Sequence, residues 1–367
     1  MPPGGKRTSE SFRASVAQFV ARTLRPRASR WEAAGRFPLR ALAECARRGY
    51  FRLEGDEAAI LAEELPACES LGFALSVFVQ ANLVAPLVNE LGSRAQKKNC
   101  GKPLLEGQMF GCVAVSEPVA GSDFRALQCE ARPSRNRLVL NGSKTYITNA
   151  AFADFAVTAV RIAGRDPESL SLVLVPLRAE GVRVKPLPTL GLVTSGMGAI
   201  EFRNCRLPAD GLLGEADQGF AYIQRVLNRE RLLGGIAAVA WAQYALERTI
   251  SFARERRAFG SSIGRFQAVR HQLAEAAARL EAARQMNYAA FARWLRQEEV
   301  TREICMIKLV AYQTAQDVIT TCLQLHGGLG YLEGHWISRF YRDARALTIA
   351  AGTPEVMKEI IAAYLRI

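Results

Sequence analysis

The hydrophobic pattern of this chain changes its period twice, and this change limits the fold more than any other feature of the sequence. Between residues 109 and 215, short apolar runs alternate with Gly, Pro and Asp, a pattern typical of β-strands and turns. Asn141-Gly142 separates two of these runs and indicates a tight hairpin turn. No helix of crossover length lies between the runs, so we expect an antiparallel sheet or barrel rather than a doubly wound domain.

On both sides of this segment the apolar residues recur at the spacing of α-helices. Leu39 and Leu42 share one face before Gly49, which suits the end of a helix. After the strand segment, Leu232 and Ile236 begin a long apolar stripe of the same kind. The sequence therefore predicts helices before the sheet and a second set of long helices after it.

We therefore expect an α+β multidomain fold made of three parts. The predicted parts are an N-terminal helical domain (1–108), a central antiparallel β-sheet or barrel domain (109–216) and a C-terminal bundle of the four-helix type (217–367). A chain of 367 residues is long enough for two or three domains with a large core.

Charge and cysteine usage narrow the class of site and partner. The chain has 48 basic and 35 acidic residues, and the resulting net charge of +13 suits an acidic partner. Because the basic residues are spread along the chain, this charge argues against a nucleic-acid-binding surface. The eight cysteines include no C-x-x-C pair and the three histidines lack metal-ligand spacing, so we expect a cytoplasmic protein without a metal site. We also expect no membrane helix, since no apolar run approaches ~18 residues.

Two segments combine hydroxyls, small residues and turns at the ends of apolar runs. The first is Val113–Asp123, and the second, Lys144–Asn149, follows about twenty residues later. Backbone amides and hydroxyls at such positions can face a planar polar ring or a phosphate. Together the segments predict a ligand cradle, although ordinary turn chemistry at two strand ends is the alternative.

These segments also carry a resemblance to a known family. Five stretches resemble the acyl-CoA dehydrogenases in order and at the family's intervals, and together they cover nearly the whole chain. The five stretches are Val115–Asp123, Tyr146–Asn149, Glu255–Gly260, Gln324–Gly328 and Tyr341–Ala344. The order of helices, sheet and helices is also the architecture of that family.

The resemblance implies that the chain binds FAD and that two subunits of a homodimer or homotetramer share each cofactor site. Val115 and Ser116 would then lie along the pyrimidine edge of the flavin. The residues that the resemblance assigns to FAD are Val115, Ser116, Gly121, Ser122, Tyr146, Ile147, Thr148, Thr353 and Glu355, with Arg256, Phe259, Gln324 and Gly328 acting across the interface. From the residues alone, a surface cation at Arg256 and a helix-packing role for Gly328 remain open.

The resemblance also indicates where a catalytic base lies. Removing a proton next to a thioester carbonyl needs a carboxylate, and many members of the family carry it where this chain has Ala351. The segment Leu227–Leu232 instead resembles the isovaleryl and long-chain branch, whose glutamate occupies the position of Glu230. The resemblance implies Glu230 as the base, the backbone N–H of Ala351 as a donor to the developing oxyanion, and close approach at Gly352. A solvated glutamate in the first turn of a helix is the alternative.

The expected reaction is the FAD-dependent α,β-dehydrogenation of an acyl thioester of coenzyme A or of an acyl carrier protein. Ser122, Asn228 and Arg231 are the expected substrate contacts, and an electron transfer flavoprotein or another acceptor would receive the electrons. Two alternatives remain open: a flavin-dependent oxidase or oxygenase on the same fold, and a non-catalytic DNA-binding relative. Val119 and Ser195–Met197 depart from the family's pattern.

Overall fold

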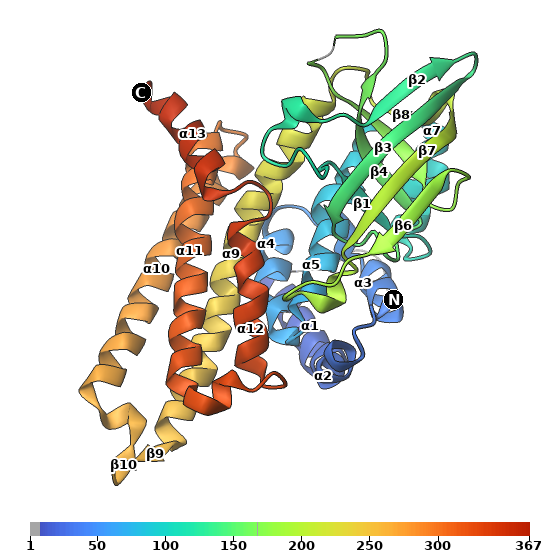
Figure 1. The fold of residues 1–367 in the computed structure, drawn as a ribbon. Helices are drawn as coiled ribbons and strands as arrows, with labels where there is room; N and C mark the ends of the chain where they lie inside the picture. Colours follow the sequence, from blue (N-terminus) through green and yellow to red (C-terminus); the bar gives the residue numbers. More distant parts are fainter. Residues whose placement is uncertain (1–7, 167) are drawn as a thin grey trace.

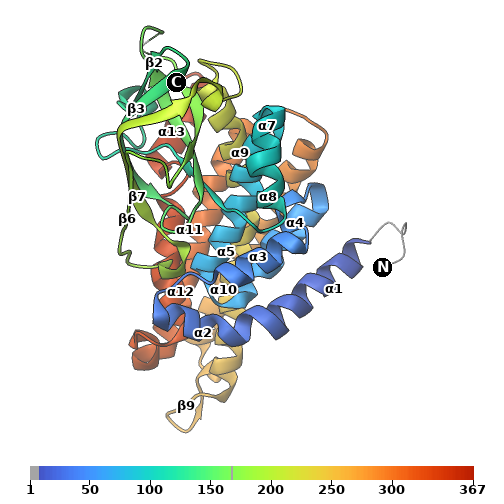
Figure 2. The same cartoon turned by 90° about the vertical axis from the view of Figure 1, so that its right-hand side faces the viewer.

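The structure is a computed structural model that describes residues 8–166 and 168–367. A helical part, a sheet and a second helical part follow one another along the chain, which confirms the predicted fold class. Figures 1 and 2 show the strands gathered at one end of the molecule. The small hairpin of β9 (Arg257–Ala258) and β10 (Ser261–Ser262) lies at the opposite end.

The N-terminal part consists of short helices, several of which are joined by π-helical turns. These helices are α1 (Ser9–Phe19), α2 (Arg25–Ala34), α3 (Leu39–Arg47), α4 (Gly55–Glu64), α5 (Leu71–Val79), α6 (Ala85–Leu91), α7 (Arg94–Gln96) and α8 (Lys102–Leu105). A left-handed glycine, Gly49, follows α3, as the sequence indicates.

One helical segment of this part corrects the expectation that no run is apolar enough to cross a membrane. Leu71–Leu91, which spans α5 and α6, has 21 residues and a mean hydropathy of 1.8. However, 89% of its apolar window is buried inside the fold, where the segment contacts both the sheet and the C-terminal helices. A buried core helix passes the same test of length and composition, so the segment is weak evidence for a membrane span.

The central part forms one sheet that is mostly antiparallel. Its strands are β1 (Gly111–Ala114), β2 (Glu130–Ser134), β3 (Arg137–Ile147), β4 (Phe155–Ile162), β5 (Ser171–Pro176), β6 (Val182–Pro186), β7 (Gly198–Pro208) and β8 (Leu212–Leu213). Within the described residues they pair in the order β6-β7-β3-β2-β4-β5-β8, and β1 also pairs with β4. The pairings of β1 and β2 with β4 are parallel, a feature that the sequence pattern did not indicate.

The predicted hairpin turn at Asn141-Gly142 is wrong. Strand β3 runs through both residues, and the turn between β2 and β3 lies earlier, at residues 135–136. Gly142 has φ +139° at a bulge opposite β7, and a Cβ there would lie 2.8 Å from the Cα of Cys129. The Asn141 side-chain oxygen accepts the backbone N–H of Asn204 at 2.8 Å. The pair therefore shapes a bulge, where glycine permits close approach of another strand.

The C-terminal part is a bundle of long helices with two shorter ones at its side. Its helices are α9 (Gly219–Glu255), α10 (Gln267–Leu295), α11 (Thr301–His326), α12 (Trp336–Ala344) and α13 (Pro354–Leu365). Helix α9 is 37 residues long and packs against α10 and α11 on one side and against α4 on another. Because of this position, α9 forms much of the contact between the N-terminal helices and the bundle.

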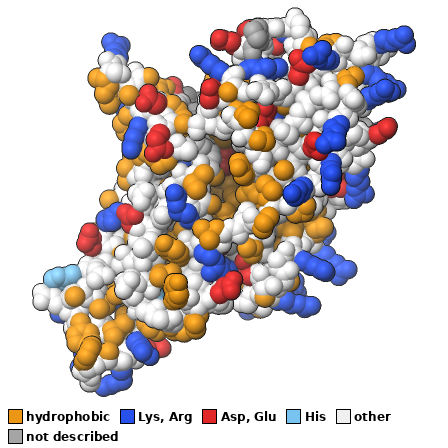
Figure 3. Space-filling view, viewed as in Figure 1, with side chains coloured by type: hydrophobic (Ala, Val, Ile, Leu, Met, Phe, Trp, Pro, Cys, Tyr) orange, Lys and Arg blue, Asp and Glu red, His pale blue; other side chains and the backbone are white. Residues whose placement is uncertain are grey.

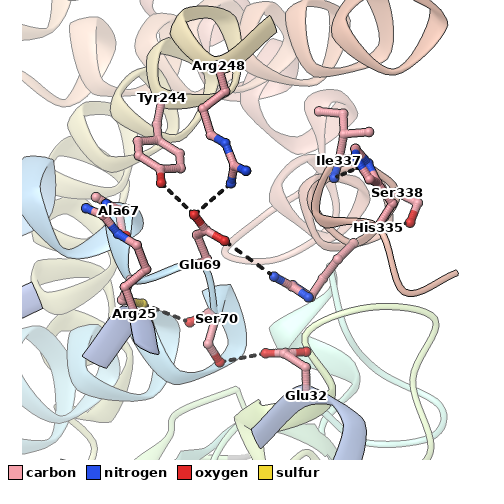
Figure 4. A network of polar contacts seen from close by, with 12 residues as sticks. Arg25, Glu32, Ala67, Glu69, Ser70, Tyr244, Arg248, His335, Ile337 and Ser338 are labelled. Carbon is pink, nitrogen blue, oxygen red and sulfur yellow. Dashed lines mark hydrogen bonds and ion pairs between the residues drawn. The ribbon is translucent and has the colours of Figure 1, made fainter. Parts of the chain in front are cut away.

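Glu69 fastens the N-terminal helices to α9, as Figure 4 shows. Its carboxylate accepts hydrogen bonds from the Tyr244 hydroxyl at 2.6 Å and from the Arg248 guanidinium at 2.7 Å. Glu69 directly follows the 3₁₀ turn Leu65–Cys68 and has a left-handed φ of +63°. This network holds the turn against the C-terminal half of α9.

All eight cysteines are buried and free of disulfides. Burial raises the pKa of Cys68 to about 12 and that of Cys322 to about 11. At neutral pH these thiols are therefore protonated and shielded from solvent.

Asp343 on α12 anchors the loop between β6 and β7. One of its carboxylate oxygens accepts the backbone N–H of Leu192 at 2.5 Å, while the other has no partner among the described residues. Burial, with a smaller contribution from Glu32, raises the pKa of Asp343 from its ordinary value of 3.8 to about 7. Arg339 and Arg342 oppose this shift. The loop anchor is thus a carboxyl group that is costly to ionise in the folded protein.

This carboxyl group makes the stability of the fold depend on pH. Since the folded pKa lies above the unfolded one, its stabilisation is complete below pH ~4 and is lost as the pH rises towards ~7. We expect Asp343→Asn, which keeps an acceptor for Leu192, to raise the melting temperature relative to the parent protein more at pH 8 than at pH 5. Calorimetry at both pH values measures this difference, and an equal change at both would contradict the assignment.

Candidate active site

An apolar cavity lies between the N-terminal helices and the bundle, and Figure 3 shows a hollow lined by hydrophobic side chains near the middle of one face. Small side chains on α4, including Ala58 and Ala62, form part of its wall, and Ala74 and Phe78 on α5 form another part. The turn that Glu69 holds in place contributes Leu65. The cavity wall is therefore built from segments that lie far apart in the sequence.

Helix α9 supplies one complete side of the cavity through Glu230, Gly234, Ala237 and Trp241. The spacings of four, three and four residues place them on a single face of the helix. At a rise of 1.5 Å per residue, Glu230 and Trp241 are separated by roughly 16 Å along the axis. The cavity thus extends over about three helical turns, with a carboxylate and an indole as the two ends of its α9 wall.

Glu230 is the acidic side chain that lines this cavity. Because α9 begins at Gly219, Glu230 stands three turns inside the helix, and the alternative of a first-turn glutamate is wrong. The Glu230 side chain makes no hydrogen bond or ion pair in the described part of the chain. Burial raises the pKa of Glu230, while the charges of Lys308 and Arg231 lower it. The carboxylate is therefore free to take a proton from a ligand in the cavity.

Ala351 and Gly352 form a left-handed turn at the edge of the cavity, with φ values of +56° and +103°. Ala351 lines the cavity, and its carbonyl oxygen accepts a hydrogen bond from Nε of Arg231 at 2.8 Å. Its own N–H has no acceptor within residues 8–166 and 168–367. This N–H can therefore donate to an oxygen atom of a bound molecule.

Arg231 and Asn228 lie beside this turn. The Arg231 side chain is only 3% exposed, and its second guanidinium contact is the Asn228 amide oxygen at 3.3 Å. Asn228 also donates to the Thr301 hydroxyl at 3.1 Å. The placement of Arg231 does not support the expected contact with a carrier's phosphates, because its guanidinium is buried and directed at the Ala351 carbonyl.

The structure brings the two predicted cradle segments together through a buried ion pair. Lys144 on β3 donates to the Glu117 carboxylate and to the Val115 carbonyl, both at 2.8 Å. The Thr145 N–H donates to the Ser116 carbonyl at 2.9 Å. Both side chains of the pair are almost fully buried. The pair was not predicted, although opposite charges in two apolar segments were a signal in the sequence.

Val115, Ser116 and Tyr146–Thr148 form what we call the strand-end corner. A bulge between Lys144 and Ile147 interrupts the pairing of β3 with β7, and Tyr146 there has φ +59° and is 69% exposed. The hydroxyls of Ser116 and Thr148 are half-buried and have no side-chain hydrogen bond in the described residues. The corner therefore offers an exposed ring and two free hydroxyls.

Further polar atoms without partners lie behind the corner. The side-chain amide of Asn149 and the hydroxyl of Ser195 are buried and lack hydrogen bonds among the described residues, although the Asn149 N–H donates to the Ser195 carbonyl at 2.9 Å. Buried polar groups are normally paired, so such atoms mark a place where a polar ligand or water completes the structure. Gly121 and Ser122, which lie close to Ser116 in sequence, are exposed.

The other predicted cofactor residues lie elsewhere in the single chain. Arg256 and Phe259 belong to the β9–β10 hairpin, at the end of the molecule opposite the sheet (Figures 1 and 2). Phe259 has φ +50° and is 97% exposed, which is unusual for a large apolar side chain. Gln324 and Gly328 are also exposed, at the end of α11. One chain alone does not join these residues to the strand-end corner.

Thr353 and Glu355 stand at the start of α13. The Thr353 hydroxyl accepts the Val356 N–H at 3.5 Å and caps the helix, and Glu355 is exposed in the first turn. Neither side chain lines the cavity.

Models of one protein family match most of the chain in three successive parts. Residues 6–108 match the acyl-CoA dehydrogenase N-terminal domain, residues 112–205 match the middle domain, and residues 217–365 match the C-terminal domain.

Individual proteins show the same similarity. The mitochondrial long-chain specific acyl-CoA dehydrogenase of Sus scrofa is 33% identical, over 96% of this chain and 85% of that protein. The structure of a probable acyl-CoA dehydrogenase from Mycobacterium abscessus has a TM-score of 0.93 and 33% identity, covering 98% of this chain and 99% of that one. The prolyl acyl carrier protein oxidase AnaB has a TM-score of 0.92 and 25% identity, covering 99% of this chain and 100% of that one.

Proposed function

Because this chain belongs to the acyl-CoA dehydrogenase family, whose members are oxidoreductases acting on CH–CH bonds, we propose that it oxidises an acyl thioester to the α,β-unsaturated product with FAD. The free carboxylate of Glu230 supports this function most directly. It lies in an apolar cavity that also contains Ala351, whose backbone N–H is unpaired in the described residues. Proton removal next to a thioester requires a base and a hydrogen-bond donor to the developing oxyanion. Glu230 and the Ala351 N–H supply these two groups in the same cavity.

The family is FAD-dependent, and the strand-end corner fits this cofactor. The free hydroxyls of Ser116 and Thr148, with the unpaired buried atoms of Asn149 and Ser195, match a planar ligand with polar edges. When bound, FAD supplies the acceptor for the hydride that leaves the β carbon. The residues proposed to hold it within one chain are Val115, Ser116, Gly121, Ser122, Tyr146, Ile147, Thr148, Thr353 and Glu355.

We assign the proton transfer to Glu230. Its ionised carboxylate takes the proton from the carbon next to the thioester carbonyl, and burial makes this carboxylate a stronger base than a solvated one. The N–H of Ala351 donates to the thioester oxygen, on which negative charge develops. Gly352 has no side chain, so the substrate can approach this turn closely.

A second copy of the chain would complete the cofactor site. The exposed Phe259 and the neighbouring Arg256 lie at the β9–β10 hairpin, which is at the end of the molecule away from the sheet. Gln324 and Gly328 are exposed at the end of α11. We propose that these residues contact FAD held mainly by a neighbouring subunit, in a homodimer or homotetramer. An exposed aromatic side chain of this size is better accommodated in such an interface than in water.

The proposed substrate is an acyl thioester of either coenzyme A or an acyl carrier protein. Ser122 and Asn228 are the proposed contacts to the substrate, while the buried Arg231 is not. The net charge of +13 suits the phosphates of coenzyme A as well as an acidic acyl carrier protein. An electron transfer flavoprotein is the proposed acceptor.

An oxidase acting on a carrier-bound acyl group is the second candidate, because AnaB, a prolyl acyl carrier protein oxidase, has nearly the same fold. It would use the same base and differ in passing the electrons to oxygen. A DNA-binding role has less support, because many arginines are engaged with carboxylates, such as Arg293 with Glu298 and Glu303.

Anaerobic mixing with acyl thioesters tests the proposed function. We expect bleaching of the bound flavin and a product lighter by two hydrogens with at least one member of a series of short, long, branched and aromatic acyl groups. Offering each group on coenzyme A and on an acyl carrier protein identifies the carrier. Rapid recolouring in air with peroxide formation would identify the oxidase. Absence of bleaching with every thioester would contradict both functions.

A further inference from the structure

Two buried cations hold the loop that connects α12 to α13, and neither was predicted to act there. Arg231 on α9 donates from Nε to the Ala351 carbonyl at 2.8 Å, and Lys308 on α11 donates from Nζ to the Leu347 carbonyl. The two side chains are 3% and 4% exposed. They approach the same loop from two different helices.

We propose that Lys308 and Arg231 are positioning residues that fix this loop and keep the neighbouring Glu230 ionised as a base, an inference that rests on the proposed function. Lys308 and Glu230 line the same cavity, together with Ala351 of the loop. The loop contacts and the charge on Glu230 thus depend on the same pair of cations.

The loop needs such an anchor because its conformation is unfavourable for its sequence. Ala351 has φ +56°, a region that residues with a Cβ seldom adopt, and it persists only where surrounding contacts hold it. The guanidinium of Arg231 also lies close to Gly352, where a Cβ would be 3.2 Å from one of its nitrogens. With the carbonyl of Ala351 tied to Arg231, its N–H is left to face a ligand.

The charge of Lys308 matters because Glu230 has no hydrogen-bond donor in the described residues. A buried carboxylate is costly unless charges or donors offset the loss of water. The groups around Glu230 are Lys308 and Tyr312 on α11 and Arg231 on α9. Tyr312 is already engaged, since its hydroxyl donates to the Arg231 carbonyl at 3.0 Å. Within residues 8–166 and 168–367, the charges of Lys308 and Arg231 are therefore the groups that favour the ionised form of Glu230.

Lys308 is also held where its charge can act. Its Nζ lies 3.8 Å from the centroid of the Tyr312 ring, a cation–π contact that partly replaces water. Burial lowers the pKa of Lys308 to about 7, and Glu230 opposes that shift. Lys308 and Glu230 thus each favour the charged form of the other across the cavity, although no salt bridge joins them in the described residues.

Substitutions at Lys308 separate its hydrogen bond to the Leu347 carbonyl from its positive charge. Lys308→Gln can still donate to the Leu347 carbonyl but carries no charge, Lys308→Met removes both, and Lys308→Arg keeps both. Lys102→Met, at an exposed lysine on α8, is the matched control. We expect the rate constant of anaerobic flavin reduction at saturating thioester to fall by about 10- to 100-fold in Lys308→Gln, within the range of general-base effects. Lys308→Arg should restore most of it, and Lys102→Met should not change it.

The second readout does not depend on turnover. Glutamate labelled with ¹³C at the side-chain carboxyl, with the signal of residue 230 identified by its loss in Glu230→Gln, reports the ionisation of Glu230 directly. The pKa of Glu230 should rise by about one unit or more in Lys308→Gln and Lys308→Met, because a neighbouring cation is lost. It should stay near its original value in Lys308→Arg.

The outcomes distinguish this inference from the proposed function. An unchanged Glu230 titration in folded Lys308→Gln would overturn the inference, even if the enzyme reduces its flavin normally. A shifted titration in a protein that no thioester bleaches would support the electrostatic coupling and contradict the proposed function. Should Lys308→Met fail to fold, Lys308→Gln and Lys308→Arg still decide the matter.

Discussion

Glu230→Gln is expected to lower the rate of flavin reduction by an acyl thioester about 10³-fold, within the range that general-base catalysis contributes. Glutamine keeps the size and shape of the side chain but cannot accept the proton. Because the Glu230 side chain has no hydrogen bond or ion pair in the described residues, the substitution breaks no direct contact and removes only its longer-range charge interaction with Lys308 and Arg231. The variant should therefore fold and retain its FAD.

Stopped-flow absorbance under anaerobic conditions measures this rate, and flavin content and melting temperature check the fold. Glu247→Gln is the matched control, since Glu247 lies on the exposed side of the same helix. It should leave the rate unchanged. Reduction by Glu230→Gln within about tenfold of the parent rate would show that another group takes the proton.

Lys144→Met should destabilise the fold by about 3–5 kcal/mol, the usual cost of removing one partner from a buried ion pair. The Lys144 side chain has no exposed surface, and its loss leaves the Glu117 carboxylate buried beside two backbone N–H donors, those of Gln128 and Cys129. These two bonds cannot replace the missing positive charge. Since Lys144 also holds the Val115 carbonyl, the strand-end corner should loosen and lose FAD.

Denaturant unfolding and the flavin content of the purified protein measure the two effects. The double variant Glu117→Gln with Lys144→Met removes the stranded charge and should recover part of the lost stability. Arg203→Met is the control, because the Arg203 side chain is 77% exposed in its pair with Glu201 and such pairs contribute less than about 1 kcal/mol. Equal effects of Lys144→Met and Arg203→Met would contradict the role assigned to the buried pair.

The fold was predictable from the sequence because the period of the apolar residues reports local structure directly. The hairpin assigned to Asn141-Gly142 failed for a non-local reason. The signal of this dipeptide for a tight turn is strong, yet pairing with β7 and close packing on Cys129 convert it into a bulge. Parallel pairing of β1 and β2 with β4 likewise depends on contacts between strands that the local pattern does not contain.

The candidate site was predictable in part. The position of Glu230 followed from a short motif, and the structure places that residue on the cavity. The cavity itself was not predictable, because its walls come from separate helices. The hydrophobic pattern of a single segment does not specify how such helices pack against one another. Lys308 gave no signal, because a single lysine in an apolar helical stripe normally points its charge to solvent. Arg231 was noticed, but its partner, the Ala351 carbonyl, lies 120 residues away in sequence.

The burial of all eight cysteines affects how sensitive this protein is to oxidation. Flavin enzymes that meet oxygen can generate peroxide close to their own side chains, and exposed thiolates are the first groups to be oxidised. Here every thiol is enclosed, and burial raises the pKa of Cys68 to about 12, so almost no thiolate is present to react. The native fold therefore protects these thiols from peroxide. Oxidation of these cysteines would indicate molecules that have already unfolded.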